Sequence, residues 1–167
     1  MKNMKFLGYC MMALLMGLVC LPVMAGDNVV MVEKTVAESA KGATLSLTLN
    51  NQDRINGLQF DIHLPKGVTV VDDKNNSPKL TERLKGLNLV CREISEGVYR
   101  FLAFSMNGSF VLGNTGAIVV IPLQFEQSFA KGEYEVKLTN VMLSVNGPDN
   151  TNSSSTSPDN TGILIVQ

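Results

Sequence analysis

The sequence predicts an all-β fold, a jelly-roll-type sandwich or barrel of about nine strands. Two patterns support this prediction: apolar residues recur with a period of two rather than 3.6, and the segments with that period are separated by turn residues. A third observation is length, because 167 residues are enough to bury a packed core. Successive side chains of a strand point to opposite faces, so each segment should bury one face.

The first half of the chain supplies four expected strands: residues 29–36, 44–49, 58–64 and 68–71. The second of these alternates Leu with Thr or Ser throughout. In the third, the polar positions are Gln59, Asp61 and His63, and Pro65 ends the segment. The fourth is short and consists of β-branched residues, which favour strands.

The second half supplies five more expected strands: residues 87–94, 98–105, 117–125, 134–138 and 163–166. The first two are joined by Ser95-Glu96-Gly97, a hairpin-like connection in which Gly supplies the turn. Residues 117–125 are apolar on nearly both faces, which indicates a strand in the centre of a sheet. The side chains expected between two sheets are Leu47, Phe60, Ile62, Phe125, Val136 and Leu138.

Two segments do not follow this pattern. Ser77 and Pro78 are suitable as the N-cap and first residue of a short helix ending at Gly86, although an irregular connection fits equally well. Residues 147–162 are low in complexity and contain Pro-Asp-Asn-Thr twice, which predicts a solvated loop before the last strand. Acidic and Asn residues in this loop and at positions 72–75 lack the spacing of a calcium loop and are interpreted as turn residues.

Residues 1–25 predict a secretory signal peptide. Lys2 and Lys5 precede an uncharged apolar stretch at 6–21, and Ala25 is a suitable residue before a cleavage site. The stretch is short for a membrane anchor, which needs about 20 residues, and Val19 before Cys20 disfavours a lipoprotein signal. We therefore expect one exported domain, residues 26–167, that is secreted, at the cell surface or periplasmic, without membrane insertion after cleavage.

Charge and composition argue against several functions. Removing Lys2 and Lys5 leaves 12 basic residues against 15 acidic ones, a net charge of −3, which gives no attraction to nucleic acid. His63 is the only histidine, and Cys91 is the only cysteine after the leader, so zinc ligands are too few. No nucleophile elbow or phosphate-binding loop occurs. The sequence predicts no catalytic residue, metal or cofactor, and a Cys91 thiol buried in the core.

Several segments resemble cohesin domains. Residues 55–65, Ile-Asn-Gly-Leu-Gln-Phe-Asp-Ile-His-Leu-Pro, followed by Gly-Val-Thr-Val at 67–70, resemble the third-strand region of that family. The Gly-Asp-Asn-Val at 26–29 is similar to its Gly-Asp opening, which cohesins usually place before the second strand. Further matches lie at 116–125, 132–136 and 162–166. The pattern also fits cohesin-like modules of secreted proteins from Bacteroides-type bacteria.

The resemblance implies a nine-stranded jelly-roll sandwich, related in fold to carbohydrate-binding modules, that binds protein rather than catalyses a reaction. In cohesins that bind dockerins, polar residues two apart before the third-strand Phe contact the partner. Those positions are Gly57 and Gln59 here, and Gly57 has no side chain. The sequence therefore departs from the usual dockerin-binding pattern at one of the two positions.

Two functions remain open. The first is a protein-interaction module, cohesin-like or adhesin-like, whose partner is another extracellular or surface protein. The second is a carbohydrate-binding module whose partner is a polysaccharide. Sugar platforms usually need exposed aromatic rings, and after the leader the chain has no Trp, with only Phe110 and Phe129 as candidates in loops. This favours the protein partner.

A candidate partner-binding site follows from strand geometry. If the apolar residues at 58–64 face the core, Gln59, Asp61 and His63 project from the other face. The resemblance assigns that face to the partner-binding sheet. Arg100 and an outward Leu102 would add a small anchor patch. The alternative is a solvated face with an Asp61–His63 pair. On the binding interpretation, replacing Asp61, His63 and Arg100 together should preserve the fold and abolish partner capture.

The leader gives a direct prediction. Because cleavage is expected after Ala25, the exported protein should begin at Gly26 or within about two residues of it. Mass spectrometry of the intact exported chain measures this start. A mature chain that retains Met1 would contradict the prediction, and a lipid on Cys20 would instead identify a lipoprotein.

Overall fold

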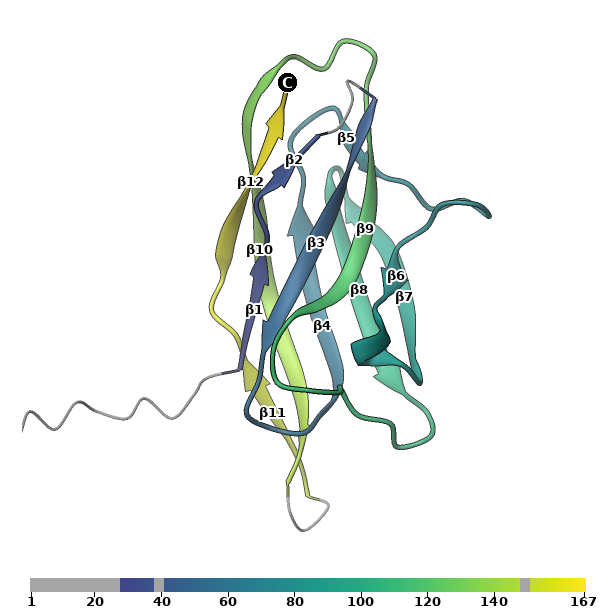
Figure 1. The fold of residues 1–167 in the computed structure, drawn as a ribbon, viewed down its shortest axis with the longest axis vertical. Coiled ribbons are helices and arrows are strands. Elements are labelled where there is room, and N and C mark those ends of the chain that lie inside the picture. The colour runs from purple at the N-terminus through teal and green to yellow at the C-terminus, as the bar shows by residue number, and fades with distance from the viewer. Residues whose placement is uncertain (1–27, 38–40, 148–150) are drawn as a thin grey trace, which may run out of the picture.

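Two β-sheets pack face to face in the computed structural model, which describes residues 28–37, 41–147 and 151–167 (Figure 1). The expected signal peptide lies outside the described residues. The all-β, jelly-roll-type sandwich predicted from the sequence is confirmed. The part of the chain that is described contains twelve strands rather than about nine, and no helix in it is long and apolar enough to cross a membrane.

The strands fall into a five-stranded and a seven-stranded sheet. In chain order they are β1 (Val29–Val32), β2 (Thr35–Val36), β3 (Gly42–Asn50), β4 (Ile55–His63), β5 (Val68–Val70), β6 (Lys79–Leu80), β7 (Leu87–Ser95), β8 (Val98–Ser105), β9 (Ala117–Phe125), β10 (Gly132–Asn146), β11 (Asn152–Thr156) and β12 (Asn160–Val166). The smaller sheet has the order β1-β3-β9-β5, and β6 also pairs with β9. The larger has the order β2-β12-β10-β4-β8-β7, and β11 also pairs with β10.

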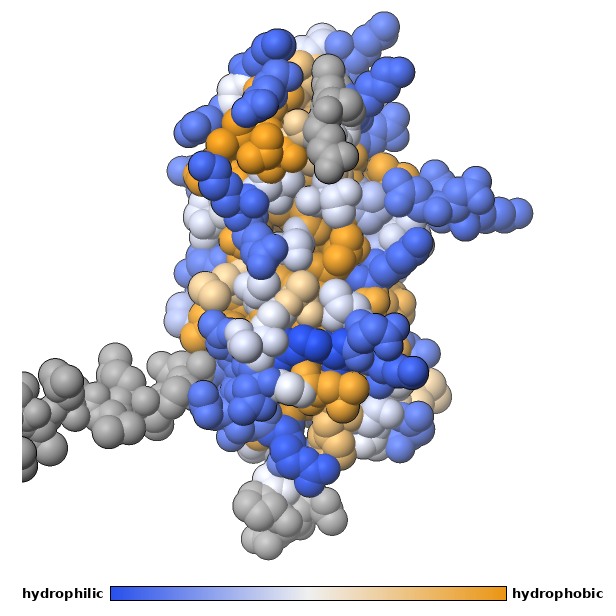
Figure 2. All heavy atoms as spheres, viewed as in Figure 1, coloured by the Kyte–Doolittle hydropathy of each residue, from blue (hydrophilic) through white to orange (hydrophobic). Residues whose placement is uncertain are grey.

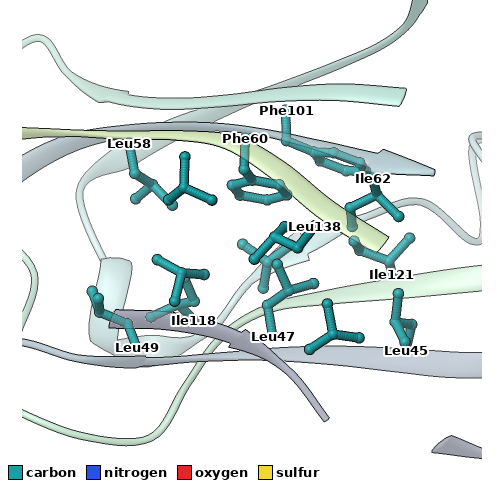
Figure 3. Close-up of a cluster of buried hydrophobic side chains, with 14 of the residues drawn as sticks. Leu45, Leu47, Leu49, Leu58, Phe60, Ile62, Phe101, Ile118, Ile121 and Leu138 are labelled. Carbon is teal, nitrogen blue, oxygen red and sulfur yellow. The ribbon is translucent and has the colours of Figure 1, made fainter. Parts of the chain in front are cut away.

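The core lies between the sheets and is built from the apolar phase of each strand. All six side chains predicted to face inward are buried, each 5% exposed or less. Figure 3 shows the leucines of β3 facing Leu58, Phe60 and Ile62 of β4. The rings of Phe60 and Phe101, on neighbouring strands, stack with centroids 5.0 Å apart. The period-two pattern therefore predicted the buried face correctly.

The predicted β7–β8 hairpin is also present. Ser95 pairs with Val98, so Glu96 and Gly97 form the connection. Gly97 has a φ of 70°, a left-handed conformation that glycine adopts without a steric penalty. The hairpin places β7 at the edge of the seven-stranded sheet, beside β8.

The short helix considered for residues 77–86 does not form. Lys79 and Leu80 instead make β6, which pairs with Val120 and Val119 of β9. Only a single 3₁₀ turn, η1 (Glu82–Leu84), follows. The edge of β9 offers backbone hydrogen bonds to this segment, and this tertiary pairing overrides a local helical preference.

The loop predicted at 147–162 is also wrong for the described residues 151–162. Asn152–Thr156 form β11, which pairs with the second half of β10, and β12 begins at Asn160. Strand pairing uses backbone groups, so a polar Ser- and Asn-rich segment can join a sheet without entering the core. The Asp149 of this segment lies outside the described residues.

β10 exchanges its neighbour at Asn140. It pairs with β12 up to Leu138 and with β11 from Met142, and its register against β4 shifts between Thr139 and Met142. Asn140 has a φ of 53°, a left-handed conformation that Asn tolerates better than most residues. This irregularity turns the side chains of both Thr139 and Asn140 to the outer face of the sheet. Thr139 is half-buried there, and Asn140 is exposed.

Arg83, in η1, fastens the long connection between β8 and β9. Its guanidinium group donates hydrogen bonds of 2.6–3.1 Å to five oxygens, which belong to the carbonyls of Leu49, Leu112, Gly113 and Gly116 and to the side chain of Asn51. These acceptors come from the end of β3 and from residues 112–116. One side chain therefore holds the connection against the five-stranded sheet.

The burial of Phe60 predicts a large effect of Phe60→Ala. Phe60 is fully buried and stacked on Phe101, so the free energy of unfolding should fall by about 3–5 kcal/mol. Val90→Ala is the control, because Val90 is half exposed and should cost under about 1 kcal/mol. Urea unfolding of both variants measures the difference. A loss under about 1 kcal/mol for Phe60→Ala would show that β4 is assigned to the wrong phase.

Candidate binding face

The structure brings all five predicted site residues onto the outer face of the seven-stranded sheet. Gln59, Asp61 and His63 lie on β4, and Arg100 and Leu102 lie on the adjacent β8. In the antiparallel register, Gln59 is opposite Leu102, and Asp61 is opposite Arg100. The predicted projection of these residues away from the core is therefore correct in direction, although not all of them reach solvent.

Exposed apolar side chains cross this face in one row. The apolar row consists of Val90 on β7, Leu102 on β8 and Met142 on β10, in register with Gln59 on β4. Val90 is 50%, Leu102 40% and Met142 48% exposed. Sequence analysis missed Val90 and Met142. Each lies between two apolar residues in the sequence, so no alternation marks it as outward-facing, and only the strand register places the two beside Leu102.

Asp61 makes the main polar interaction of the face. Its carboxylate accepts hydrogen bonds from Arg100 Nε at 2.7 Å and Nη2 at 2.8 Å, and from Asn140 Nδ2 at 2.8 Å. The side chain of Asp61 is 3% exposed, whereas that of Arg100 is 41% exposed. The hydrogen bonds from Arg100 hold the pKa of Asp61 below its ordinary value, although burial opposes this effect. The same bonds raise the pKa of Arg100.

These contacts correct two expectations. Asp61 does not project into solvent, because Arg100 and Asn140 cover its carboxylate. It also pairs with Arg100 rather than with His63, whose Nε2 lies 2.8 Å from Thr139 Oγ1. Replacing Asp61, His63 and Arg100 together would remove an ion pair whose carboxylate is buried, so that variant would test folding as well as binding.

A charged row lies next to the apolar row. It consists of Arg92 on β7, Arg100 on β8 and Asp61 on β4, which are directly opposite one another across the strands. Arg92 is exposed and forms no ion pair within the described part of the chain. The row therefore holds two guanidinium groups and one carboxylate, and its net charge is positive.

On the other side of the apolar row the face is hollowed. The Gly57 hollow has a volume of about 380 Å³, with Leu102, Phe104, Met142 and Ser144 around Gly57 and Ser154 of β11 at its border. Gly57 lies between Phe104 and Ser144 in the strand register. A side chain at position 57 would occupy this space, so the missing Cβ helps to create the hollow.

A second hollow lies on the outer face of the five-stranded sheet, the side viewed in Figure 2. It has a volume of about 510 Å³, and its polar groups include Lys41, Thr44, Asn76 and Gln124. No aromatic residue lines it among the described residues. Hydrophobic and hydrophilic residues are mixed across this side in Figure 2.

The two rings considered as a sugar platform are both engaged in packing. Phe129 lies between Phe125 and Tyr134, with centroids 5.1 and 4.5 Å away. The guanidinium carbon of Arg54 lies over the ring of Phe110, 4.0 Å from the ring centre. Both side chains are half-buried. Phe129 therefore has two ring neighbours, and Arg54 covers one face of Phe110.

Chemically reactive groups are few. Cys91 is half-buried, and burial raises the pKa of its thiol to about 12, so the nucleophilic thiolate is scarce at neutral pH. The carboxylate of Asp73 accepts hydrogen bonds of 2.8 Å from the backbone N–H groups of Asn75 and Asn76. This is the turn role expected from the sequence. Within the described ranges, no group of three or more His, Cys, Asp or Glu side chains could hold a metal ion.

Comparison with solved structures shows which class the fold belongs to. The chain is similar to the seventh type I cohesin of ScaB from Pseudobacteroides cellulosolvens, with TM-score 0.68, 20% identity, and coverage of 84% of this chain and 92% of that one. It is also similar to the sixth cohesin of Acetivibrio cellulolyticus scaffoldin B, solved with a dockerin, with TM-score 0.69, 11% identity, and coverage of 85% and 100%.

A third similar structure is a non-cellulosomal cohesin from the archaeon Archaeoglobus fulgidus, with TM-score 0.62, 8% identity, and coverage of 85% of this chain and 92% of that one. The sequence itself matches no family model and no curated protein. The chain is a cohesin-like domain in fold, and the resemblance noted in the sequence is confirmed at that level.

The Asp61 geometry predicts a specific dependence of stability on pH. The folded-state pKa of Asp61 is lowered, so its ionised form stabilises the fold above the unfolded-state pKa of about 3.9, and this contribution is lost as the pH falls through the lower folded value. Asp61→Asn should therefore unfold more easily than the parent protein at neutral pH. The difference should shrink below about pH 4.

Urea unfolding at several pH values between about 3 and 7 measures this difference. Glu135→Gln is the matched control, because Glu135 and its partner Lys137 are both largely exposed and their charged atoms are 3.8 Å apart. That variant should change stability little at any pH. A difference for Asp61→Asn that stays constant down to the lowest pH would contradict the assigned role of the ionised carboxylate.

Proposed function

We propose that this chain is a non-catalytic protein-interaction module that binds a protein partner through the outer face of β10, β4, β8 and β7. The observation that carries the proposal is the apolar row of Val90, Leu102 and Met142 beside the charged row, in which Asp61 holds Arg100. Interfaces commonly place apolar anchors and arginine together, with charge at the border.

The predicted site residues take different roles in this proposal. Leu102 and Arg100 contact the partner directly, because each is about two-fifths exposed. Gln59 and His63 are half-buried and contribute a smaller part of the contact surface. Asp61 is a positioning residue, since its two hydrogen bonds fix the guanidinium plane of Arg100.

The cohesin fold supports a protein as the partner. The cohesin from Acetivibrio cellulolyticus was solved in complex with a dockerin, so a dockerin-carrying protein is one candidate partner. Export by the expected signal peptide would place the module in the periplasm, at the cell surface or outside the cell. The partner would then be another exported or surface protein, as in a cohesin-like or adhesin-like assembly.

Carbohydrate binding is the second candidate function. It is favoured by the 510 Å³ polar hollow on the five-stranded sheet, where the amide groups of Asn76 and Gln124 and the hydroxyl group of Thr44 could meet sugar hydroxyls. The absence of an aromatic residue among the described residues that line this hollow argues against it, as do the ring contacts of Phe129 and the Arg54 contact of Phe110. A glycan array with the purified protein tests this candidate directly.

A pull-down from a surface-protein extract, repeated with a dockerin panel, tests the protein-binding proposal. The double variant Leu102→Glu with Met142→Glu should weaken capture by at least about tenfold, because two charged side chains would replace the apolar contacts of the row. Met31→Glu is the control, since Met31 is similarly exposed at 38% but lies on β1 of the other sheet.

The control variant should capture the partner as well as the parent protein. Retained capture by the double variant, with loss in Met31→Glu, would move the interaction to the other sheet. Specific glycan binding that both variants retain, without any protein captured, would favour the carbohydrate-binding function.

A further inference from the structure

We propose that Asn107 is a site of self-catalysed deamidation, in which the backbone nitrogen of Gly108 attacks the side-chain amide carbon of Asn107. The products carry aspartate or isoaspartate at position 107. This inference goes beyond the proposed function and does not depend on it. It rests on three hydrogen bonds that converge on one amide oxygen in the loop after β8.

The chain contains three Asn-Gly steps, at residues 56–57, 107–108 and 146–147. Asparagine before glycine is the pair most open to this attack, because glycine has no Cβ to crowd its own nitrogen and leaves the backbone free to turn. The three steps are the same in sequence, so only their surroundings in the fold distinguish them.

Asn107 is exposed, and three donors point at its side-chain oxygen. Oδ1 accepts hydrogen bonds from the backbone N–H of Ser109 at 3.2 Å, from Ser109 Oγ at 2.7 Å and from Ser105 Oγ at 3.1 Å. A backbone N–H can only donate, so the side-chain atom that faces it is the oxygen. This bond closes a ring through the peptide unit of Gly108, and the ring brings Cγ of Asn107 toward the Gly108 nitrogen.

The reaction needs only water. The Gly108 nitrogen forms a bond to Cγ of Asn107 and gives its proton, through water, to Nδ2. The bond between Cγ and Nδ2 then breaks, and Nδ2 leaves as ammonia. The product is a succinimide ring, and water opens it at either carbonyl to give aspartate or isoaspartate. No group is oxidised or reduced.

The three hydrogen bonds promote the first step. Negative charge develops on Oδ1 when the Gly108 nitrogen adds to Cγ, and donors already aimed at that oxygen stabilise the charge. Ser109 is held in place, because its side chain packs against Gly86 and the Val111 N–H donates a hydrogen bond of 2.8 Å to the carbonyl of Ile55. The donors are therefore positioned before the reaction begins.

The step at 56–57 lacks this arrangement. Asn56 is half-buried in β4, and Gly57 is buried and pairs with Phe104 on one side and Ser144 on the other. Pairing on both sides holds the backbone extended. The backbone rotation that ring closure needs would break these pairs.

The step at 146–147 lacks it for a different reason. The Gly147 N–H donates a hydrogen bond of 2.9 Å to the carbonyl of Thr151, so the attacking nitrogen is already engaged. Asn146 Oδ1 is buried and has no hydrogen-bond partner within the described part of the chain. Charge on that oxygen would develop without a donor to stabilise it.

Deamidation would change the charge beside the candidate face. It replaces a neutral amide by a carboxylate two residues after β8 ends at Ser105, which borders the Gly57 hollow. The isoaspartate product also adds one methylene group to the backbone of the loop.

Peptide mapping of the purified full chain tests the proposal. The folded protein is kept at constant temperature and mildly alkaline pH and is sampled over several days. Trypsin places the three steps in separate peptides, residues 55–66, 101–131 and 138–167. Mass spectrometry with fragmentation measures the loss of each amide, and a protein isoaspartyl methyltransferase detects the isoaspartate. Asn107 should react at least about tenfold faster than Asn56 and Asn146.

Unfolding the chain gives the reference rates. In guanidinium chloride the three identical steps should react at similar rates, because the surroundings that distinguish them are lost. Asn107 should react at least as fast in the folded protein as in the denatured one, whereas Asn56 and Asn146 should react more slowly when folded.

Ser109→Ala removes one donor and keeps the backbone N–H. It should slow the reaction at Asn107 by about two- to tenfold in the folded protein and leave the rate unchanged in denaturant. Ser128→Ala is the matched control, because Ser128 is exposed on the connection between β9 and β10. Circular dichroism and thermal melting check that both variants fold.

Two results would overturn the proposal. If Asn107 reacts no faster than Asn56 or Asn146 in the folded protein, it is not a preferred site. If Ser109→Ala and Ser128→Ala react at the parent rate, the hydrogen bonds to Oδ1 do not promote the reaction, and exposure alone sets its rate.

Discussion

The organisation of the candidate face depends on the carboxylate of Asp61, which joins three strands at one point. It binds Arg100 on β8 and Asn140 on β10 while lying on β4 itself. Asn140 is the residue at which β10 leaves regular geometry and exchanges β12 for β11. A polar group that is almost fully buried needs all its partners, so this pairing fixes both the irregularity and the position of the Arg100 guanidinium group.

Features that depend on residues close together in the sequence could be predicted, and features that depend on residues far apart in the sequence could not. Burial of Leu47 or Phe60 follows from residues two apart, so the period along one strand predicted it. The partners of Asp61 are 39 and 79 residues away, and no local pattern indicates which cation or amide reaches it. Val90 and Met142 were missed for the same reason. β11 was missed because its pairing uses backbone groups, which composition does not reveal.

The face lies on strands rather than on loops, which affects how it would recognise a partner. β4, β8 and β10 have neighbours on both sides, so their backbones are held by two sets of hydrogen bonds. A partner would meet side chains that are already positioned, and only flexible groups such as Met142 and Arg92 would need to be ordered. Binding to such a surface proceeds with little backbone movement and a small entropic cost.

Arg83 orders the connection between β8 and β9 through an ionic group rather than through strand pairing. Five oxygens converge on one positive charge, an arrangement for which many proteins recruit a dissolved cation. Here the cation is covalently attached to the chain, so its effective concentration at the site is set by the fold and not by the surrounding medium. A chelator cannot remove it and dilution cannot release it. The connection between β8 and β9 thus keeps its shape in surroundings whose ion content varies.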